Sequence, residues 1–307
     1  MQQAQIVSEA VIEETQIKEI SFLSSIKNEF LLIEVDKELS PRKSRHLTEF
    51  EKAASNIFFT PLSCQENYSG NYDNYLRATL NHISSLQNLP YEKALSNPDI
   101  FINYPSKEIK ESLDPNKKLI LLDLDETLIH SEHDIKDKDI NKYDSIIRFK
   151  DSTSDSNEYY QIGIYIRNGV HNFLSVLNKY FVVGIFTASE KDYADAIIKH
   201  LDPNRNIIKF CLYRNNCINV NDLINIKDLR IIKDVNMSKT VLVDNNIYSF
   251  APQLSNGILI NSFYGDKNDV ELLNVLSYLL EFILPADDVR KVNEEIFGFK
   301  RIIQQME

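Results

Sequence analysis

Four short apolar runs set the strongest limit on how this chain folds. They occupy residues 119–122, 181–186, 240–243 and 257–260. Nearly continuous apolar runs of this length are typical of strands buried on both faces. Segments with helical patterning lie among them, at residues 170–179, 189–201, 269–283 and 287–297. Strands that alternate with helices predict an α/β fold, a parallel sheet with helices on both faces.

Two further segments predict a small insertion into this fold. Residues 146–149 and 159–166 resemble short strands, and a polar, turn-like stretch separates them. This pattern is typical of an antiparallel pair. Downstream, Ser189 is expected to cap the helix that runs to about residue 201, with Asp192 in the capping-box position.

Residues 1–115 differ from the rest in their sequence pattern, because the alternation of apolar strand-like runs with helical segments begins only at residue 119. They predict an N-terminal extension that is helical and partly disordered, followed by the main domain at residues 116–300. A basic cluster at residues 42–45 leaves a nuclear-import signal and a solvated loop as alternatives. What residues 1–115 do is left open by the sequence.

Composition excludes several classes of partner. The 34 Lys and Arg residues against 45 Asp and Glu give a net charge of −11, which argues against direct nucleic-acid binding. No apolar run approaches the length of a membrane span. Three cysteines without paired spacing predict neither a disulfide framework nor a zinc site. We expect an intracellular protein, nuclear or cytoplasmic, whose oligomeric state the sequence leaves open.

Polar residues directly follow three of the apolar runs. Asp123 and Asp125 follow the first, Thr187 the second, and Asp244 and Asn245 the third. Ligands of such sheets bind at the carboxyl ends of the strands, so we expect these side chains to form one site.

This set of residues suits phosphoryl transfer. One carboxylate attacks phosphorus, and a second carboxyl group protonates the leaving oxygen and then activates water. A metal ion and a cation must offset the repulsion between two anions. The oxygen donors predict Mg²⁺ as cofactor, with Asp123, Asp125, Asp244 and Asn245 as the metal site.

Several motifs, in order, resemble one known family. They are residues 123–131 (Asp-Leu-Asp-Glu-Thr-Leu-Ile-His-Ser), 186–189 (Phe-Thr-Ala-Ser), 191–195, 214–217, 227–229 and 244–245. Over about residues 115–300 the chain resembles the Fcp/Scp-type, NLI-interacting-factor-like phosphatases of the haloacid dehalogenase superfamily. These act on the C-terminal domain of RNA polymerase II, and Dullard-type phosphatases are related to them.

The resemblance implies a role for each catalytic group. Asp123 would be the nucleophile and a metal ligand, and Asp125 the general acid and base with its carbonyl on the metal. Asn245 would ligate the metal, with Asp244 as a ligand or beside one. Lys227 would neutralise phosphate charge, although Lys233 and Lys239 are rivals for that role.

The resemblance also implies groups that hold the substrate. Thr127, Thr187 and the neighbouring Ala188 backbone would hold phosphoryl oxygens. Tyr193 and Arg214 match positions near a substrate groove. His130 and Cys217 are expected to be structural.

The implied activity is a magnesium-dependent protein serine/threonine phosphatase that works through an aspartyl-phosphate. Its substrate would be the RNA polymerase II C-terminal domain or another phosphoprotein. A small-metabolite phosphatase and a catalytically silent binding module remain alternatives.

Two details refine the expected substrate site. No cap domain fits between the motifs, so we expect an open groove for an extended phosphopeptide, lined by residues 146, 162, 164 and 193. Arg167 is followed by Asn168 and Gly169 where relatives carry proline, which predicts a looser turn there.

Overall fold

The computed structural model describes most of the chain from residue 116 onward. Described are residues 79, 83, 84, 86, 87, 116–133, 135, 137–150, 159–220, 224–232 and 234–304. All of them belong to one compact unit, Leu47–Glu307. The basic cluster, Lys233 and nearly all of the expected 1–115 extension lie outside the described residues, so the domain boundary stays a prediction.

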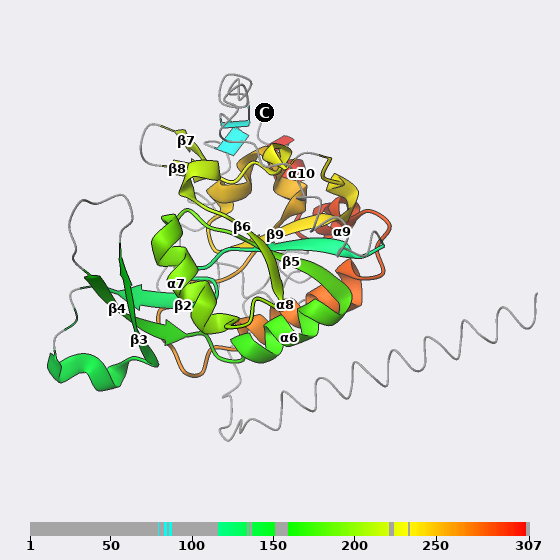
Figure 1. The fold of residues 1–307 in the computed structure, drawn as a ribbon. Coiled ribbons are helices and arrows are strands. Elements are labelled where there is room, and N and C mark those ends of the chain that lie inside the picture. The colour runs from blue at the N-terminus through cyan, green and yellow to red at the C-terminus, as the bar shows by residue number, and fades with distance from the viewer. Residues whose placement is uncertain are drawn as a thin grey trace, which may run out of the picture. The chain divides into compact units, whose positions relative to one another are not determined.

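A five-stranded parallel sheet forms the centre of the described fold (Figure 1). Its order is β10-β9-β1-β5-β6, with β1 at Lys118–Leu122, β5 at Phe181–Phe186, β6 at Ile208–Leu212, β9 at Thr240–Asp244 and β10 at Gly257–Leu259. All residues of β5 and β9 are buried, as the apolar runs predict. The expected α/β fold with a parallel sheet is confirmed.

Helices follow the strands as expected, with small differences at their ends. They are α6 (Val170–Tyr180), α7 (Lys191–Leu201), α8 (Glu271–Tyr278), α9 (Val289–Ile296) and α10 (Phe299–Gln304). A π-helical turn, η8 (Leu279–Ile283), extends α8. In Figure 1, α6 and α8 lie side by side, and the two helices are in contact.

The insertion is a three-stranded antiparallel sheet with the order β2-β4-β3. Its strands are β2 (Ile129–Glu132), β3 (Ser145–Lys150) and β4 (Tyr159–Ile166). The expected pair is therefore confirmed, and β2 adds a third strand that begins directly after the Asp123–Leu128 loop. In this way the insertion is joined to the end of β1.

The remaining elements are short. β7 (Ile218–Val220) pairs with β8 (Ile224–Ile226). Turns of 3₁₀ helix occur at η3 (Asp137–Lys142), η4 (Arg214–Asn216), η5 (Leu229–Ile231), η6 (Met237–Lys239) and η7 (Ile247–Asn256). No helix in the described part of the chain has the length and apolar character needed to span a membrane.

The start of α7 differs from the prediction. The helix begins at Lys191, its N-cap residue is Glu190, and no side chain caps it. Ser189 instead donates its hydroxyl hydrogen to Asp125 Oδ2 at 2.6 Å. The capping prediction was wrong because the serine hydroxyl contacts the Asp125 carboxylate instead of a backbone N–H of the first helical turn.

The turn before α6 is held by local contacts. Arg167 is fully buried, and its backbone N–H donates to Leu128 O at 3.0 Å. Gly169 has a φ of 78°, a left-handed conformation that glycine adopts without strain, and the helix begins at the next residue. These contacts hold the turn where relatives carry proline, and the looser turn stays a prediction.

Candidate active site

Three strand ends converge on one pocket. Asp123 follows β1, Thr187 follows β5, and Asp244 ends β9. The pocket has a volume of about 1040 Å³ and includes nine of the ten predicted site residues: Asp123, Asp125, Thr187, Ala188, Tyr193, Arg214, Lys227, Asp244 and Asn245. The structure thus brings together residues that are up to 122 positions apart, from Asp123 to Asn245.

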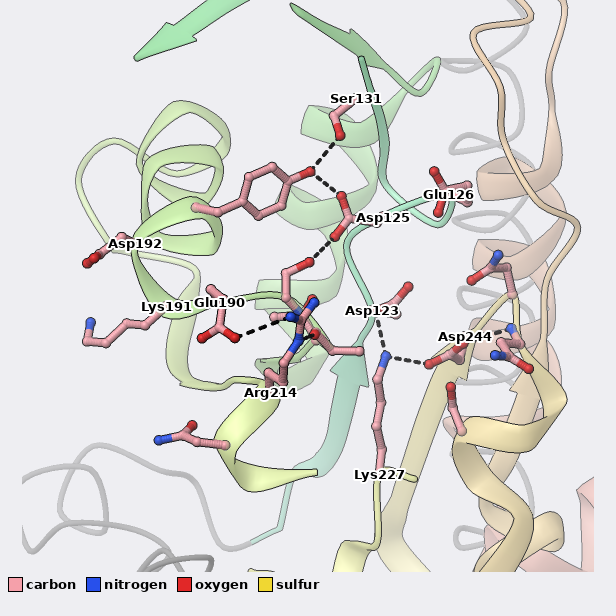
Figure 2. A pocket seen from close by; sticks show the side chains of 18 of the residues that line it. Asp123, Asp125, Glu126, Ser131, Glu190, Lys191, Asp192, Arg214, Lys227 and Asp244 are labelled. Atoms are coloured by element: carbon pink, nitrogen blue, oxygen red, sulfur yellow. Dashed lines mark hydrogen bonds and ion pairs between the residues drawn. The ribbon is translucent and has the colours of Figure 1, made fainter. Parts of the chain in front are cut away.

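A buried lysine joins two of the carboxylates (Figure 2). Lys227 Nζ donates to Asp123 Oδ1 at 2.5 Å and to Asp244 Oδ2 at 2.6 Å, and the lysine side chain is 2% exposed. Burial alone would lower the pKa of Lys227, but the two carboxylates outweigh it and raise that pKa. The lysine is therefore a permanent cation beside Asp123.

The other oxygen of Asp123 faces Thr127. The Thr127 hydroxyl lies 3.1 Å from Asp123 Oδ2 and 3.4 Å from Asn245 Oδ1. Asn245 Nδ2 donates to Ser262 Oγ at 2.9 Å, which orients the amide with its oxygen toward Thr127. Of the predicted site residues, all of which are described, Thr127 alone does not line the pocket, and its side chain is completely buried.

Asp125 sits in a different environment. It accepts hydrogen bonds from the Ser189 hydroxyl and from the Tyr193 phenol, whose oxygen also lies 2.8 Å from Ser131 Oγ. Burial, and then the charge of Asp123, raises the pKa of Asp125 to about 6. Two carboxyl groups with different environments are the arrangement that separates a nucleophile from an acid/base.

Arg167 anchors the loop that carries these carboxyl groups. Its Nη1 donates to Thr127 O at 2.9 Å and its Nη2 to Asn261 O at 2.8 Å. Its Nε and Nη2 donate to the two oxygens of Asp269, each at 2.8 Å. One side chain therefore ties the catalytic loop to the segment that precedes α8.

Arg214 also lines the pocket and contacts the turn after β5. Its Nε donates to Ala188 O at 2.6 Å and its Nη1 to Glu190 Oε1 at 3.2 Å. Thr187 Oγ1 accepts from the Ser189 N–H at 3.0 Å, which shapes the turn after β5. These contacts place a cation and a tight backbone turn beside the carboxylates.

Aromatic rings, and not aliphatic side chains, form the outer wall. Phe149 packs edge-on against Tyr193 with centroids 5.8 Å apart and stacks with Tyr160 at 5.6 Å. His133 stacks with Tyr193 at 6.3 Å. The prediction that residues 146, 162 and 164 line the groove was wrong: none lines the pocket, and Ile162 and Ile164 are fully buried in the core of the insertion.

The donor set fits a small, hard cation in part. Asp123 Oδ2 and Asn245 Oδ1 both face the Thr127 hydroxyl, and oxygen is the donor type that Mg²⁺ prefers. Asp244, however, accepts from Lys227 through Oδ2 and from the Asn246 N–H at 2.7 Å through Oδ1. Within the described residues, no three His, Cys, Asp or Glu side chains are grouped so that they could hold a metal ion.

His130 and Cys217, which were expected to be structural, contact neighbouring protein groups and do not line the pocket. His130 Nδ1 lies 3.0 Å from Glu126 Oε1, and its ring packs edge-on against Tyr264. Cys217 is buried, and burial raises its pKa to about 12, so the thiol stays protonated.

Three residues that support the site were not predicted from the sequence to do so. Ser189 and Ser131 complete the hydrogen bonds around Asp125 and Tyr193, and Arg167 secures the loop. Ser189 lies within the Phe-Thr-Ala-Ser motif, so the motif itself was a signal for it. Ser131 likewise ends the motif at residues 123–131, whereas Arg167 follows a strand of the insertion and lies in none of the motifs.

A site of paired carboxylates at the carboxyl end of a parallel α/β sheet defines a class of phosphoryl-transfer domains. The model of the NLI interacting factor-like phosphatase family matches residues 118–290. This match covers more than half of the 307 residues, and the chain belongs to that family.

Individual relatives agree with this assignment. "CTD small phosphatase-like protein 3" of Caenorhabditis elegans is 36% identical over 194 residues, which cover 63% of this chain and 64% of that protein. "CTD small phosphatase-like protein 2" of Dictyostelium discoideum is 34% identical over 64% of this chain and 32% of that protein. "CTD nuclear envelope phosphatase 1B" of Danio rerio is 34% identical over 57% of this chain and 71% of that protein. The chain thus spans less than two thirds of the length of the first two relatives.

Proposed function

We propose that the chain is a protein serine/threonine phosphatase that forms an aspartyl-phosphate on Asp123. One observation carries the proposal: the Asp123 carboxylate is held by Lys227 and Thr127, with the second carboxyl group of Asp125 two residues away. Family membership and the phosphatase names of the relatives support the same reaction.

The first half-reaction uses both carboxyl groups. An oxygen of Asp123 attacks phosphorus, and the bond from phosphorus to the serine or threonine oxygen breaks. The departing oxygen keeps the electron pair and takes a proton from Asp125. The raised pKa of Asp125, about 6, suits a group that must hold a proton near neutral pH.

The second half-reaction returns the enzyme to its starting state. Asp125, now a carboxylate, takes a proton from water as the water oxygen attacks the phosphorus of the aspartyl-phosphate. The bond from phosphorus to Asp123 breaks, and inorganic phosphate leaves. The Ser189 and Tyr193 hydroxyls hold Asp125 in place through both steps.

We assign Mg²⁺ as the cofactor, held by Asp123, Asn245 and the Asp125 carbonyl. When bound, the ion offsets the repulsion between a phosphate dianion and Asp123. Asp244 Oδ2 accepts from Lys227 Nζ at 2.6 Å, so we assign Asp244 the role of holding Lys227 beside Asp123. Lys227 and Arg214 supply the protein's own positive charge.

The substrate is a phosphorylated segment of another protein, the RNA polymerase II C-terminal domain or a different phosphoprotein, in the nucleus or cytoplasm. The aromatic wall of Phe149, Tyr160 and Tyr193 offers contacts to residues that flank the phosphate. Such contacts provide binding energy without a cap domain.

The test is a phosphopeptide array assayed with Mg²⁺. The unaltered chain should release phosphate, and Asp123→Asn should release none within detection. Asp125→Asn should lose on the order of 10²–10⁴-fold in rate. Excess chelator should stop turnover and Mg²⁺ restore it. If Asp123→Asn were as active as the unaltered chain, Asp123 would not be the nucleophile. If turnover continued in excess chelator, the reaction would not depend on a metal ion.

A further inference from the structure

A second, smaller hollow adjoins the active-site pocket and has no part in the proposed reaction. Its volume is about 400 Å³, and Lys191 lines both hollows. The other lining residues come from α7, the loop after it and β6: Asp195, Arg205, Ile208, Lys209, Phe210, Cys211 and Tyr213. Lys191 lies on the first turn of α7, beside Glu190 and Asp192 (Figure 2).

One carboxylate organises the basic side chains of this hollow. Asp195 Oδ1 accepts from Arg205 Nη2 at 2.9 Å and from the Tyr213 hydroxyl at 2.8 Å, and Oδ2 accepts from Lys191. Lys191 Nζ also lies 5.0 Å from the centroid of the Tyr213 ring. The two cations are therefore positioned before any ligand binds.

The loop that presents Arg205 is itself well ordered by hydrogen bonds. The buried Asp202 carboxylate accepts from the backbone N–H groups of residues 206, 207 and 208, at 3.1, 2.9 and 2.9 Å. Arg205 adopts a φ of 51°, in the left-handed region that non-glycine residues seldom occupy. The Asp202 contacts hold the turn in that conformation and direct Arg205 toward Asp195 and Cys211.

The hollow is positive on a chain that is strongly negative. Its lining holds three basic side chains, Lys191, Arg205 and Lys209, and one carboxylate, Asp195, while the chain carries a net charge of −11. Cys211 adds no negative charge, because burial raises the pKa of its thiol. A concentration of positive charge beside a phosphate-handling pocket attracts a second anion on the same ligand.

We propose that this hollow is a subsite for a second phosphate on the substrate segment. Lys191, Arg205 and Lys209 would contact that phosphate while the first phosphate lies at Asp123. Because Lys191 borders both hollows, one extended segment with two phosphorylated residues can reach both. The inference rests on the proposed function and narrows it to multiply phosphorylated proteins.

The test measures binding, so that it does not depend on turnover. Peptides carry non-hydrolysable phosphonate analogues of phosphoserine, either one or two, with the second placed one to four residues from the first on either side. We expect one spacing to bind about fivefold to tenfold more tightly than the single phosphonate at fixed salt. Glutamate at the second position separates a need for phosphate from a general preference for acidic residues.

Two variants locate the effect. Arg205→Gln and Lys209→Gln should each reduce the affinity ratio of double to single phosphonate toward one. Lys209 donates to the carbonyl of Asn206, so its loss leaves no buried charge behind and keeps the test valid if Arg205→Gln unfolds. Arg290→Gln is the matched control, since Arg290 also pairs with a neighbouring aspartate and is 45% exposed; it should keep the full ratio.

The outcomes separate the subsite from the reaction. Equal affinity for single and double phosphonates at every spacing overturns the subsite, as does a gain that both variants retain. A gain as large with glutamate overturns the requirement for a second phosphate. Failure of every phosphopeptide to be hydrolysed, with the binding gain intact, overturns only the proposed function.

Discussion

The ion pairs of Lys227 with Asp123 and Asp244 are expected to influence both the stability of the fold and the charge of the pocket. The lysine is fully enclosed, and it neutralises carboxylates on two neighbouring strand ends. Removing one member of a buried ion pair leaves the other charge without compensation in a poorly solvating environment. The two buried carboxylates would therefore destabilise the folded state if Lys227 did not neutralise them.

Lys227→Met tests this balance. The variant leaves the Asp123 and Asp244 carboxylates facing each other, and we expect a loss of about 3–5 kcal/mol in the free energy of unfolding. Adding Asp244→Asn removes one of the two charges, so the double variant should recover part of that loss while staying inactive. Urea unfolding of the three proteins makes the comparison. Equal stability of the single and double variants would show that the two carboxylates do not repel each other.

The sequence predicted the positions of the pocket residues at the strand ends better than those of the groups around them. Asp123, Thr187 and Asp244 stand directly after apolar runs, so position in the chain alone places them at the same edge of the sheet. Ser189 and Thr127 were placed less well, because a hydroxyl can cap a helix, contact a ligand or serve a neighbouring carboxylate. Only the three-dimensional contacts decide among these uses.

One arginine, Arg167, which lies just before α6, connects several secondary-structure elements. Arg167 bonds to the catalytic loop, to the segment after β10 and to Asp269 near the start of α8. Its planar guanidinium makes these bonds in several directions at once, which an ammonium group cannot reproduce. The arginine thereby couples the packing of α8 to the position of Asp123 and Asp125.

Arg167→Lys should accordingly be a costly change despite its conserved charge. We expect it to lower the free energy of unfolding by about 3 kcal/mol or more, because Thr127 O and Asn261 O lose their donors in a buried setting. Arg290→Lys, at an exposed pair on α9, should cost under about 0.5 kcal/mol. Chemical denaturation of both variants provides the measurement. A similar small loss in both would mean that the guanidinium network contributes little.

Glu271, the first residue of α8, is expected to make the free energy of unfolding depend on pH. Glu271 is 7% exposed, and its Oε2 has no hydrogen-bond partner among the described residues. Burial raises the pKa of Glu271 from 4.5 to about 7, against the opposing charge of Arg167. The folded state therefore holds the proton more tightly than the unfolded state, and stability falls as pH rises from about 4.5 to about 7.

Glu271→Gln should remove that dependence, because glutamine cannot ionise. At pH 8 the variant should be more stable than the unaltered chain by about 2–3 kcal/mol, and at pH 5 the gap should shrink markedly. Thermal unfolding of both proteins at the two pH values isolates the effect, since all other titrations are shared. A stability difference that is the same at both pH values would contradict the buried carboxyl assignment.

Strands with two buried faces were predicted within a residue or two, and partly exposed strands were not. β5 matches its apolar run residue for residue, whereas β6 was missed. β6 lies at the edge of the sheet, and Lys209, Phe210 and Cys211 in it are only half-buried, so the apolar signal is interrupted. β2 has a single buried residue and depends on pairing with β4, which no local pattern reveals.

Substrate size is a property of the whole molecule. The insertion between β1 and α6 is one small antiparallel sheet, and in the described residues it contributes Phe149 and Tyr160 to the pocket wall. The described strands of this sheet border the pocket on one side. Under the proposed function, the substrate's own flanking residues would contribute to water exclusion and recognition.

Phosphopeptides should for this reason be far better substrates than free metabolites. A peptide can cover Phe149, Tyr160 and Tyr193 with residues on either side of the phosphate, whereas a sugar phosphate or nucleotide leaves most of that wall exposed. We expect the best phosphoserine or phosphothreonine peptide to exceed every metabolite by at least about 100-fold in kcat/KM, which corresponds to about 3 kcal/mol of additional transition-state binding. The measurement compares both panels at one Mg²⁺ concentration, with Tyr160→Ala as a check on the wall. That variant should reduce kcat/KM for peptides several-fold and leave that for a small aryl phosphate nearly unchanged. If any metabolite is turned over more efficiently than all peptides, the chain is a metabolite phosphatase built on the same fold.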